Sequence, residues 1–197
     1  GPGEGTTIDL PDGYGDSGAF TVEAWIDTPG GRTDAHQVLV ADWSLRGDLT
    51  AFESHDAGAT DGLNPKGFFG SVCDGRYVYF APQLNDNGRH GQVLRYDSHG
   101  GFQDQASWSA YDAGATSGLN TKGYYGAVHA GDYVYFVPRT DDDAHHSRLL
   151  RYDRRGDFRD AGSWSAYDIG NPVSYQSAAY DGRYIYLSPG YESDGSD

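Results

Sequence analysis

The 197-residue sequence contains one cysteine, no methionine and two lysines. With Cys73 alone, neither an intrachain disulfide nor a zinc site built on paired cysteines is possible. Long apolar runs are also missing, and none approaches the roughly 20 residues that a membrane-spanning helix needs. We therefore expect no membrane insertion.

Basic residues are scarce. The sequence has 14 lysines and arginines against 29 aspartates and glutamates, which gives a formal charge of -15. A surface this acidic repels phosphate groups, so neither nucleic acid nor an anionic membrane is an expected partner. Cations and neutral or basic ligands stay compatible with it. Net charge also keeps a protein soluble in salty or extracellular water, which is a physical role without any ligand.

What the sequence does contain is one unit used several times. Residues 108–138 read WSAYDAGATSGLNTKGYYGAVHAGDYVYFVP, and a close copy stands 56 positions upstream. A third copy begins with WSAYDIG 56 positions downstream and continues, after a shortening of five residues, as YQSAAYDGRYIYLSP. We interpret the chain as a single repeat domain with a diverged unit at 5–51, full units at 52–107 and 108–163, and a partial unit at 164–197.

Each clear unit contains four segments typical of strands. Aromatic and β-branched residues dominate them, and helical periodicity is absent. Between the first two segments stands a dipeptide that favours a tight hairpin, Asp74-Gly75 in one unit and Asp181-Gly182 in another. In the second unit the predicted strands are YYGAVH (124–129), DYVYFVP (132–138), SRLLRYD (147–153) and SWSAYD (163–168). The alternation in FTVEAWIDTP (20–29) predicts one more strand in the diverged unit.

Four antiparallel strands in about 50 residues, without a helix, are typical of a β-propeller blade. We predict an all-β fold, a β-propeller or propeller fragment of about four four-stranded blades. The phrases YVYFVP, LLRYD and SWSAYD resemble the blades of kelch-like bacterial repeat proteins, but lack the double glycine of true kelch repeats. The first forty residues, with FTVEAWI followed by QVLVADWS, resemble the start of a laminin-G-like or concanavalin-like domain.

The repeat makes two predictions about packing. The small-residue strand of each unit (GAV, GSV or SAA) suits the crowded innermost position, and both faces of the tyrosine-rich second strand are expected to pack between blades. The count of strands leaves the last blade open. The N-terminal strands, further sequence or a second chain can complete it, so a homo-oligomer is one of the expected outcomes.

Two long polar loops of each unit are predicted to share one face of a propeller, and a ligand site belongs there. The loops DAGATDGLNPKG and DAGATSGLNTKG each offer a carboxylate, an amide and a lysine to a polar ligand such as a saccharide. The candidate ligand-binding residues are Asp56, Asn64, Lys66, Asp112, Asn120 and Lys122. The structural alternative is that these side chains bond their own loops or pair with one another.

Oxygen-rich tips of the other long loops make a Ca²⁺ site conceivable, although their spacing is not that of a calcium loop. The candidate ligands are Asp86, Asp141, Asp142 and Asp143. The alternative is a solvated acidic loop tip. His145 and His146 stand nearby, but adjacent residues of one strand point to opposite sides and do not readily share a metal.

No catalytic motif is recognisable. The sequence has neither a phosphate-binding loop nor a GxSxG motif, and its few glutamates lie outside the predicted innermost strands. We predict a non-catalytic recognition or scaffold module of a bacterial secreted or surface protein, with carbohydrate or a protein partner on the long-loop face. The alternatives are a glycan-active propeller enzyme with inward carboxylates and a purely structural repeat array.

Overall fold

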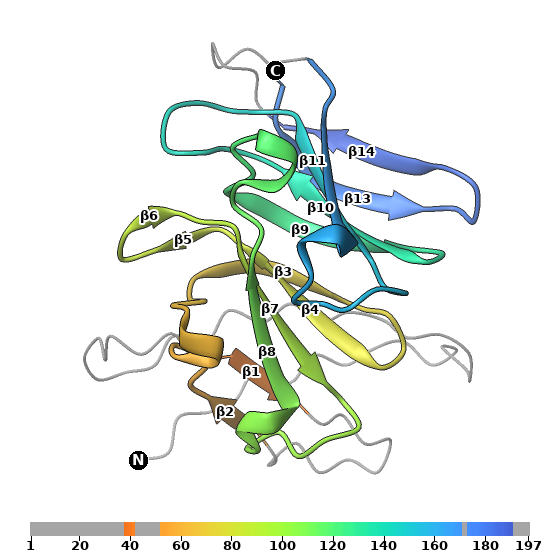
Figure 1. Ribbon diagram of the computed structural model, residues 1–197. Helices are drawn as coiled ribbons and strands as arrows, with labels where there is room; N and C mark the ends of the chain where they lie inside the picture. The colour runs from red at the N-terminus through yellow and green to blue at the C-terminus, as the bar shows by residue number, and fades with distance from the viewer. Residues whose placement is uncertain (1–37, 42–51, 171–172, 191–197) are drawn as a thin grey trace, which may run out of the picture. The chain divides into compact units, whose positions relative to one another are not determined.

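The computed structural model describes residues 38–41, 52–170 and 173–190 (Figure 1). Contacts within the chain separate Gly1–Thr33 from Asp34–Asp197, and every described residue lies in the second of these units. The predicted strand at 20–29, and with it most of the segment that resembles a laminin-G-like domain, lies outside the described residues.

The described part of the chain is built from antiparallel strands, which confirms the all-β class. Its helical residues form short 3₁₀ turns in the loops, and none of its helices is long and apolar enough to cross a membrane. The 3₁₀ helices are η1 (Thr60–Gly62), η2 (Gln105–Ser107), η3 (Thr116–Gly118) and η4 (Ala161–Ser163).

Two sheets of four strands have the same strand order, in which each strand pairs with the next one of its unit. The first contains β3 (Phe68–Cys73), β4 (Tyr77–Pro82), β7 (Gln92–Asp97) and β8 (Trp108–Asp112). The second contains β9 (Tyr124–Ala130), β10 (Tyr133–Pro138), β11 (Arg148–Asp153) and β12 (Trp164–Asp168). The four strands expected in each clear unit are therefore confirmed.

Two half-sheets repeat parts of the same pattern. They are formed by β1 (Val38–Ala41) with β2 (Phe52–His55), and by β13 (Tyr175–Tyr180) with β14 (Ile185–Pro189). Val38 pairs with His55 as Val93 pairs with Tyr111, so β1 and β2 are the last two strands of a unit. Tyr180 pairs with Ile185 as Cys73 pairs with Val78, so β13 and β14 are the first two.

The sequence did not predict one small two-stranded ribbon. The connection between β4 and β7 contains β5 (Leu84–Asn85) and β6 (Gly88–Arg89), which pair with each other. The two predicted Asp-Gly hairpin turns are present, and their glycines, Gly75 and Gly182, have φ of 101° and 97°. Glycine adopts this left-handed region without the steric cost of a Cβ atom.

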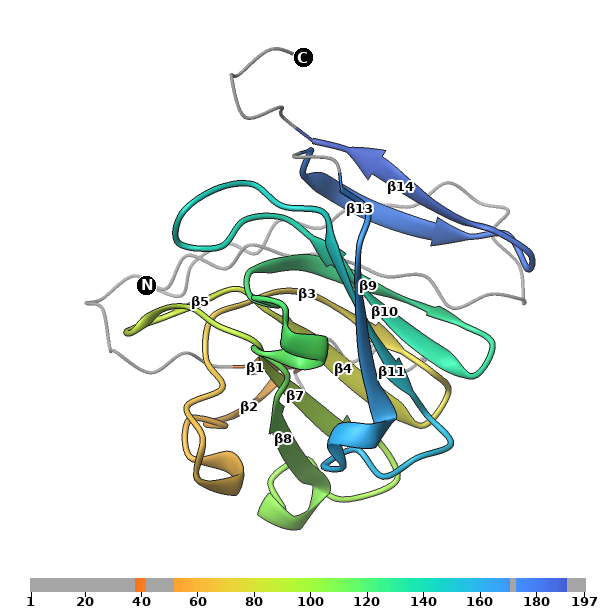
Figure 2. The same cartoon turned by 45° about the horizontal axis from the view of Figure 1, so that its top comes forward.

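The small-residue strands are the ones through which neighbouring units approach. A Cβ atom on Gly70 of β3 would lie 3.2 Å from the Cα of Gly126 in β9. Next to them, the rings of Phe69 and Tyr125 stack with centroids 3.9 Å apart. On the other side, β13 lies beside β9 in both Figure 1 and Figure 2. Small side chains at these positions let the backbones come this close.

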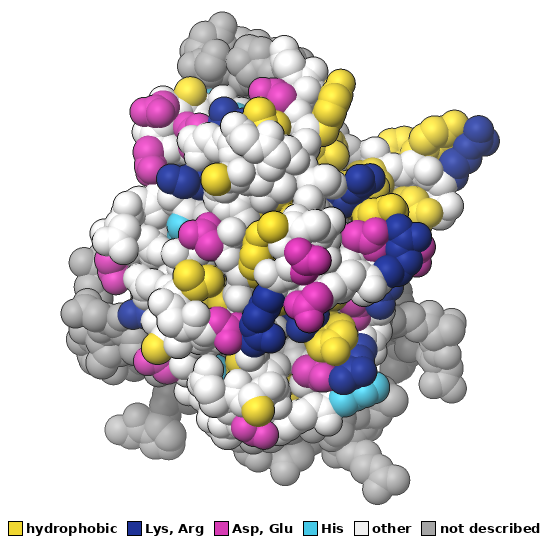
Figure 3. All heavy atoms as spheres, in the orientation of Figure 1, with side chains coloured by type: hydrophobic (Ala, Val, Ile, Leu, Met, Phe, Trp, Pro, Cys, Tyr) yellow, Lys and Arg dark blue, Asp and Glu magenta, His cyan; other side chains and the backbone are white. Residues whose placement is uncertain are grey.

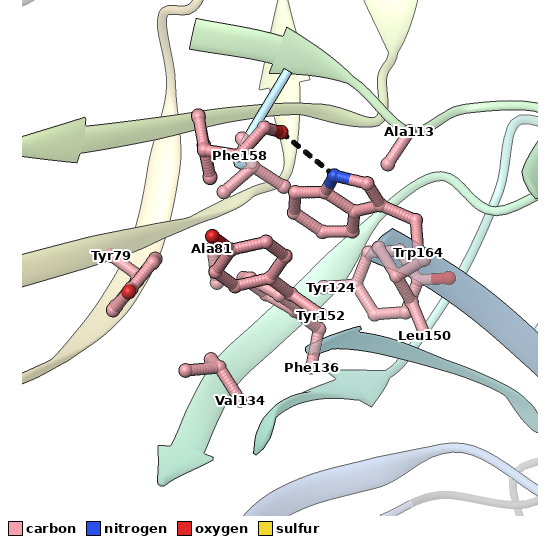
Figure 4. Close-up of a cluster of buried hydrophobic side chains, with 11 residues drawn as sticks. Tyr79, Ala81, Ala113, Tyr124, Val134, Phe136, Leu150, Tyr152, Phe158 and Trp164 are labelled. Atoms are coloured by element: carbon pink, nitrogen blue, oxygen red, sulfur yellow. Dashed lines mark hydrogen bonds between the residues drawn. The ribbon is translucent and has the colours of Figure 1, made fainter. Parts of the chain in front are cut away.

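The main core fills the space between the two four-stranded sheets (Figure 4). Tyr79 of the first sheet is 1% exposed and contacts Tyr152 and Phe158 of the second. Trp164 packs on the same rings, and its indole Nε1 donates a hydrogen bond of 2.9 Å to the Phe158 carbonyl. Burial of each such ring contributes roughly 1.5–3 kcal/mol.

An ion pair ties the same two sheets together. The side chain of Asp74, in the β3–β4 turn, is fully buried, and its Oδ2 lies 2.6 Å from Nε of Arg154. Oδ1 accepts from the backbone N–H of Arg76 and of Tyr77, and Oδ2 accepts from the hydroxyl of Tyr79 at 2.8 Å. Burial alone would raise the pKa of Asp74, but these donors together lower it below its usual value.

The tyrosine face of the second strands is covered in one unit and open in another. Tyr79, Tyr135 and Tyr186 occupy the same position of three units, and they are buried, half-buried and 56% exposed. The prediction that both faces of every second strand are packed is therefore wrong for β14. No sheet among the described residues follows β13 and β14 and covers them as the second sheet covers Tyr79.

Candidate functional site

The long loops predicted to share one face do lie together, joined by backbone hydrogen bonds. The loop 56–67 contacts the connection 83–91, since Gly67 O accepts from the N–H groups of Gln83 and Leu84. In the next unit Gly123 O accepts from Arg139 and Thr140 in the same way. The candidate site is therefore a pair of interlocked loops that occurs once per unit.

Glycine is required where these loops cross. Gly67 and Gly123 have φ of 67° and 72°. A Cβ atom would lie 1.7 Å from the carbonyl oxygen of Leu84 at the first and of Thr140 at the second. No side chain fits at that distance, so the recurring NPKG and NTKG phrases owe their glycine to this crossing.

One buried histidine holds each of the two candidate loops in place, a role that the sequence did not predict. His90 Nε2 lies 2.7 Å from the Lys66 carbonyl, and His146 Nε2 lies 2.7 Å from the Lys122 carbonyl. In both rings Nδ1 accepts a hydrogen bond from a backbone N–H, that of Gln92 or of Arg148. A carbonyl only accepts, so Nε2 carries the proton and the ring is neutral. The signal in the sequence was the spacing of 56 between the two histidines.

The neutral state of both histidines follows from their surroundings. Burial lowers the pKa of His90, although the Lys66 carbonyl opposes this. For His146, burial first and the nearby Arg148 second lower the pKa to about 4, against the opposing effect of the Lys122 carbonyl. These histidines are therefore structural clamps at neutral pH and have no free nitrogen for a proton transfer.

The clamps make folding sensitive to acid. The unfolded chain protonates His146 below pH 6.5, whereas the folded chain keeps it neutral down to about pH 4. Unfolding therefore takes up a proton in this window, and stability falls as the pH is lowered, by about 1.4 kcal/mol per pH unit and about 3 kcal/mol in total. Urea denaturation at pH 7, 5.5 and 4.5 measures this loss.

The control is His146→Gln, which removes the titrating group. We expect this variant to start from a lower stability at pH 7 and to lose less on acidification than the unmodified chain. An equal loss in both proteins between pH 6.5 and 4 would show that His146 is not held neutral by its clamp.

The predicted amide ligands take part in a brace between loops. In the second unit Asn120 Nδ2 donates to Asp141 Oδ2 at 2.9 Å, and Arg148 forms an ion pair with the same carboxylate. In the first unit Asn85 Nδ2 donates to the Asn64 carbonyl at 3.1 Å, and Gln92 Oε1 accepts from the Asn64 N–H. Asn64, Asn85 and Gln92 of the first unit correspond to Asn120, Asp141 and Arg148 of the second, at a spacing of 56 residues. The brace is thus charged in one unit and neutral in the other. Asn120 joins it through its side chain and Asn64 through its backbone.

The predicted cation ligands are not gathered into a site. Asp141 is bonded to Arg148 and to the N–H groups of Asp143 and Ala144, and these donors together outweigh burial and lower its pKa. Asp142 Oδ1 accepts from the Arg89 N–H at 2.8 Å, and Asp86 is exposed. Within residues 54–170 and 173–190 no three histidine, cysteine or acidic side chains are placed to hold a metal. Calcium binding stays a prediction of the sequence alone.

The remaining candidates keep polar atoms available. One oxygen each of Asp56 and Asp112 accepts a 2.9 Å hydrogen bond from the N–H two residues on, that of Gly58 or of Gly114, and both aspartates are exposed. The Lys66 side chain runs past Gly58, where an added Cβ atom would be 3.2 Å from Nζ and 3.0 Å from Asp56 Oδ1. Every ion pair of the described residues uses an arginine, so neither lysine is committed to one.

Comparison with known proteins does not identify the chain. The sequence matches no protein-family model and no curated protein. The function must therefore be inferred from the chemistry of the loops themselves.

Proposed function

We propose that this chain is a non-catalytic recognition module of the β-propeller type, which binds carbohydrate on its long-loop face. The observation that carries the proposal is the repeated pair of an aspartate and a lysine, Asp56 with Lys66 and Asp112 with Lys122, on loops fixed by glycine crossings and histidine clamps. Each pair keeps a carboxylate oxygen and an ammonium group outside the ion pairs of the fold. Sugar hydroxyls donate to the first and accept from the second.

The propeller architecture is supported by the repeated sheets. The two four-stranded sheets have the same order and register, and they face each other across one core. Their small-residue strands approach one another, as the inner strands of blades do. A bacterial secreted or surface protein is the setting in which we place the module, since its acidic surface suits extracellular water.

A recognition module is favoured over a glycan-active enzyme by the state of the titratable groups. The buried carboxylate of Asp74 is saturated by four donors, and that of Asp141 by an ion pair and three hydrogen bonds. Both buried histidines use both ring nitrogens. A general acid for glycoside hydrolysis needs a carboxyl group whose pKa is raised by its surroundings, whereas the pKa values of Asp74 and Asp141 are lowered.

A glycan array followed by calorimetry with the captured sugar tests the proposal. We expect binding that weakens roughly tenfold or more in Lys66→Gln/Lys122→Gln, because each lysine loses a charge-assisted hydrogen bond. Asp132→Asn, an exposed change in the β9–β10 turn, is the matched control and should bind as the unmodified chain does. Absence of any bound glycan would contradict the proposal and favour a protein partner or a structural array.

A further inference from the structure

The described residues expose large hydrophobic side chains on the β13–β14 hairpin, which is seen in yellow in Figure 3. We name two of them, Tyr184 and Tyr186, the tyrosine patch, because they stand two residues apart and so lie on one face of the hairpin. Tyr184 is 53% exposed and Tyr186 is 56% exposed. Patches of this kind on a protein surface mark sites of association.

The repeat shows what covers these positions elsewhere. Tyr79, which corresponds to Tyr186, is buried against Tyr152 and Phe158 of the sheet that follows it. Tyr77, which corresponds to Tyr184, packs against the same core between the two full sheets. The cover is in each case the aromatic face of the next unit.

The local geometry of the patch is already that of a covered face. The Tyr186 hydroxyl donates to Asp181 Oδ2 at 2.8 Å, as the Tyr79 hydroxyl donates to Asp74 at 2.8 Å. Asp181 also accepts from the N–H groups of Arg183 and Tyr184, which matches the turn at Asp74. Tyr186 is therefore exposed because no sheet among the described residues covers it, and not because β14 folds differently.

From these observations we infer that the tyrosine patch and the edge of β14 bind a second copy of this chain, with β1 of that copy pairing with β14. Among the described residues β14 pairs with β13 alone and β1 with β2 alone. Joined in this way they form one four-stranded sheet in the order β13, β14, β1, β2. The first full sheet of the second copy then covers Tyr186 with Tyr96 and Phe102, which correspond to Tyr152 and Phe158.

The repeat also fixes the register of the new pair. In the full sheets Val78 pairs with Tyr96 and Val134 with Tyr152. Carried over to β14 and β1, the same alignment pairs Ile185 with Ala41 of the second copy, and Tyr186 with its Val40. A shift by one residue would turn the patch to the other side of the sheet.

A second copy of the chain is the partner that closes the sheets into a ring. The described residues of each copy form two full sheets and two half-sheets of the repeat, so in a reciprocal pair they give four full and two composite sheets, six in all. Closed propellers have roughly four to eight blades, whereas one chain closed on itself would have three. A head-to-tail contact that repeats twice around a twofold axis forms such a ring.

Size-exclusion chromatography with light scattering at about 100 µM tests the inference on the 197-residue chain. We expect a dimer, and Tyr186→Glu should raise its dissociation constant at least tenfold. Leu84→Glu places the same charge on an exposed hydrophobic residue away from the patch, so it should leave the dimer intact. A monomer, an open polymer, or an equal effect of both variants would overturn the inference.

A cysteine pair tests the register independently. In a Cys73→Ser background, Ile185→Cys/Ala41→Cys and Tyr186→Cys/Val40→Cys place neighbouring pairs across the new edge, and one of them lies at the closer, non-hydrogen-bonded spacing. Oxidation of that variant should give a covalent dimer in a denaturing gel. Ile185→Cys/Val38→Cys, three residues out of register, should not. A disulfide formed only within one chain would overturn the second-copy assignment. Neither outcome depends on glycan binding, which is proposed for the long loops.

Discussion

Gly123→Ala is expected to lower the free energy of unfolding by about 4 kcal/mol, among the largest effects available in this chain. The added Cβ atom would lie 1.7 Å from the Thr140 carbonyl oxygen, which is backbone and has no rotamer to change. Either the crossing of the two loops opens or the hydrogen bonds from Arg139 and Thr140 to Gly123 O are lost. Urea denaturation monitored by tryptophan fluorescence measures the change.

Gly131→Ala is the matched control. Gly131 has a positive φ of 60°, so alanine is strained there too, but nothing lies within 4 Å of an added Cβ atom. This variant should lose only about 1 kcal/mol. If both variants lose the same amount, backbone strain accounts for the effect and the loops do not cross as described.

Asp74→Ala is expected to destabilise the chain by about 3 to 5 kcal/mol, since one partner of a buried ion pair is removed. The substitution leaves the Arg154 guanidinium, the Tyr79 hydroxyl and two backbone N–H groups without the carboxylate that now accepts from them. The contact joins residues 80 positions apart in different sheets. Its loss therefore weakens the packing of one unit on the next, and chemical denaturation reports it.

Asp181→Ala measures the contribution of the turn alone. The difference between the losses in Asp74→Ala and Asp181→Ala is then the contribution of the contact between units. Asp181 accepts from Arg183 and Tyr184 N–H and from the Tyr186 hydroxyl, as Asp74 does from its own turn. It is exposed, however, and forms no ion pair within the described part of the chain. We expect a clearly smaller loss than in Asp74→Ala, because exposed turn groups exchange their hydrogen bonds for bonds to water. Equal losses in the two variants would assign the whole effect to the turn.

The strands could be predicted from the sequence because their signals are local. Dipeptides such as Asp74-Gly75 fix the hairpins, and the aromatic runs around Tyr79 and Tyr135 fix the strands between them. The repetition of the unit also predicted that the strand order of one sheet recurs in the next, and the two sheets do have the same strand register. The burial of individual side chains was harder to predict. Tyr79 and Tyr186 have similar local sequences and differ in which elements pack against them.

The contact between the long loops could be predicted from the sequence, but the partners of their side chains could not. The two long loops of each unit were predicted to lie together, and they do. Asn120 and Arg148, however, both bind the carboxylate of Asp141, which the sequence did not predict. Hydrogen bonds between loops more than twenty residues apart leave no local pattern. The clamping role of His90 and His146 was missed for this reason, although their spacing repeats that of the unit.

The central claim is that successive units pack face to face through defined contacts, and a double-mutant cycle on Asp74 and Arg154 tests it most directly. The cycle compares Asp74→Ala, Arg154→Ala and the double variant by urea denaturation. Packing through this ion pair predicts a coupling energy of about 2 kcal/mol, because the double variant leaves no buried charge behind. Additive effects, within about 0.5 kcal/mol, would contradict the contact and with it the stacking of the two sheets.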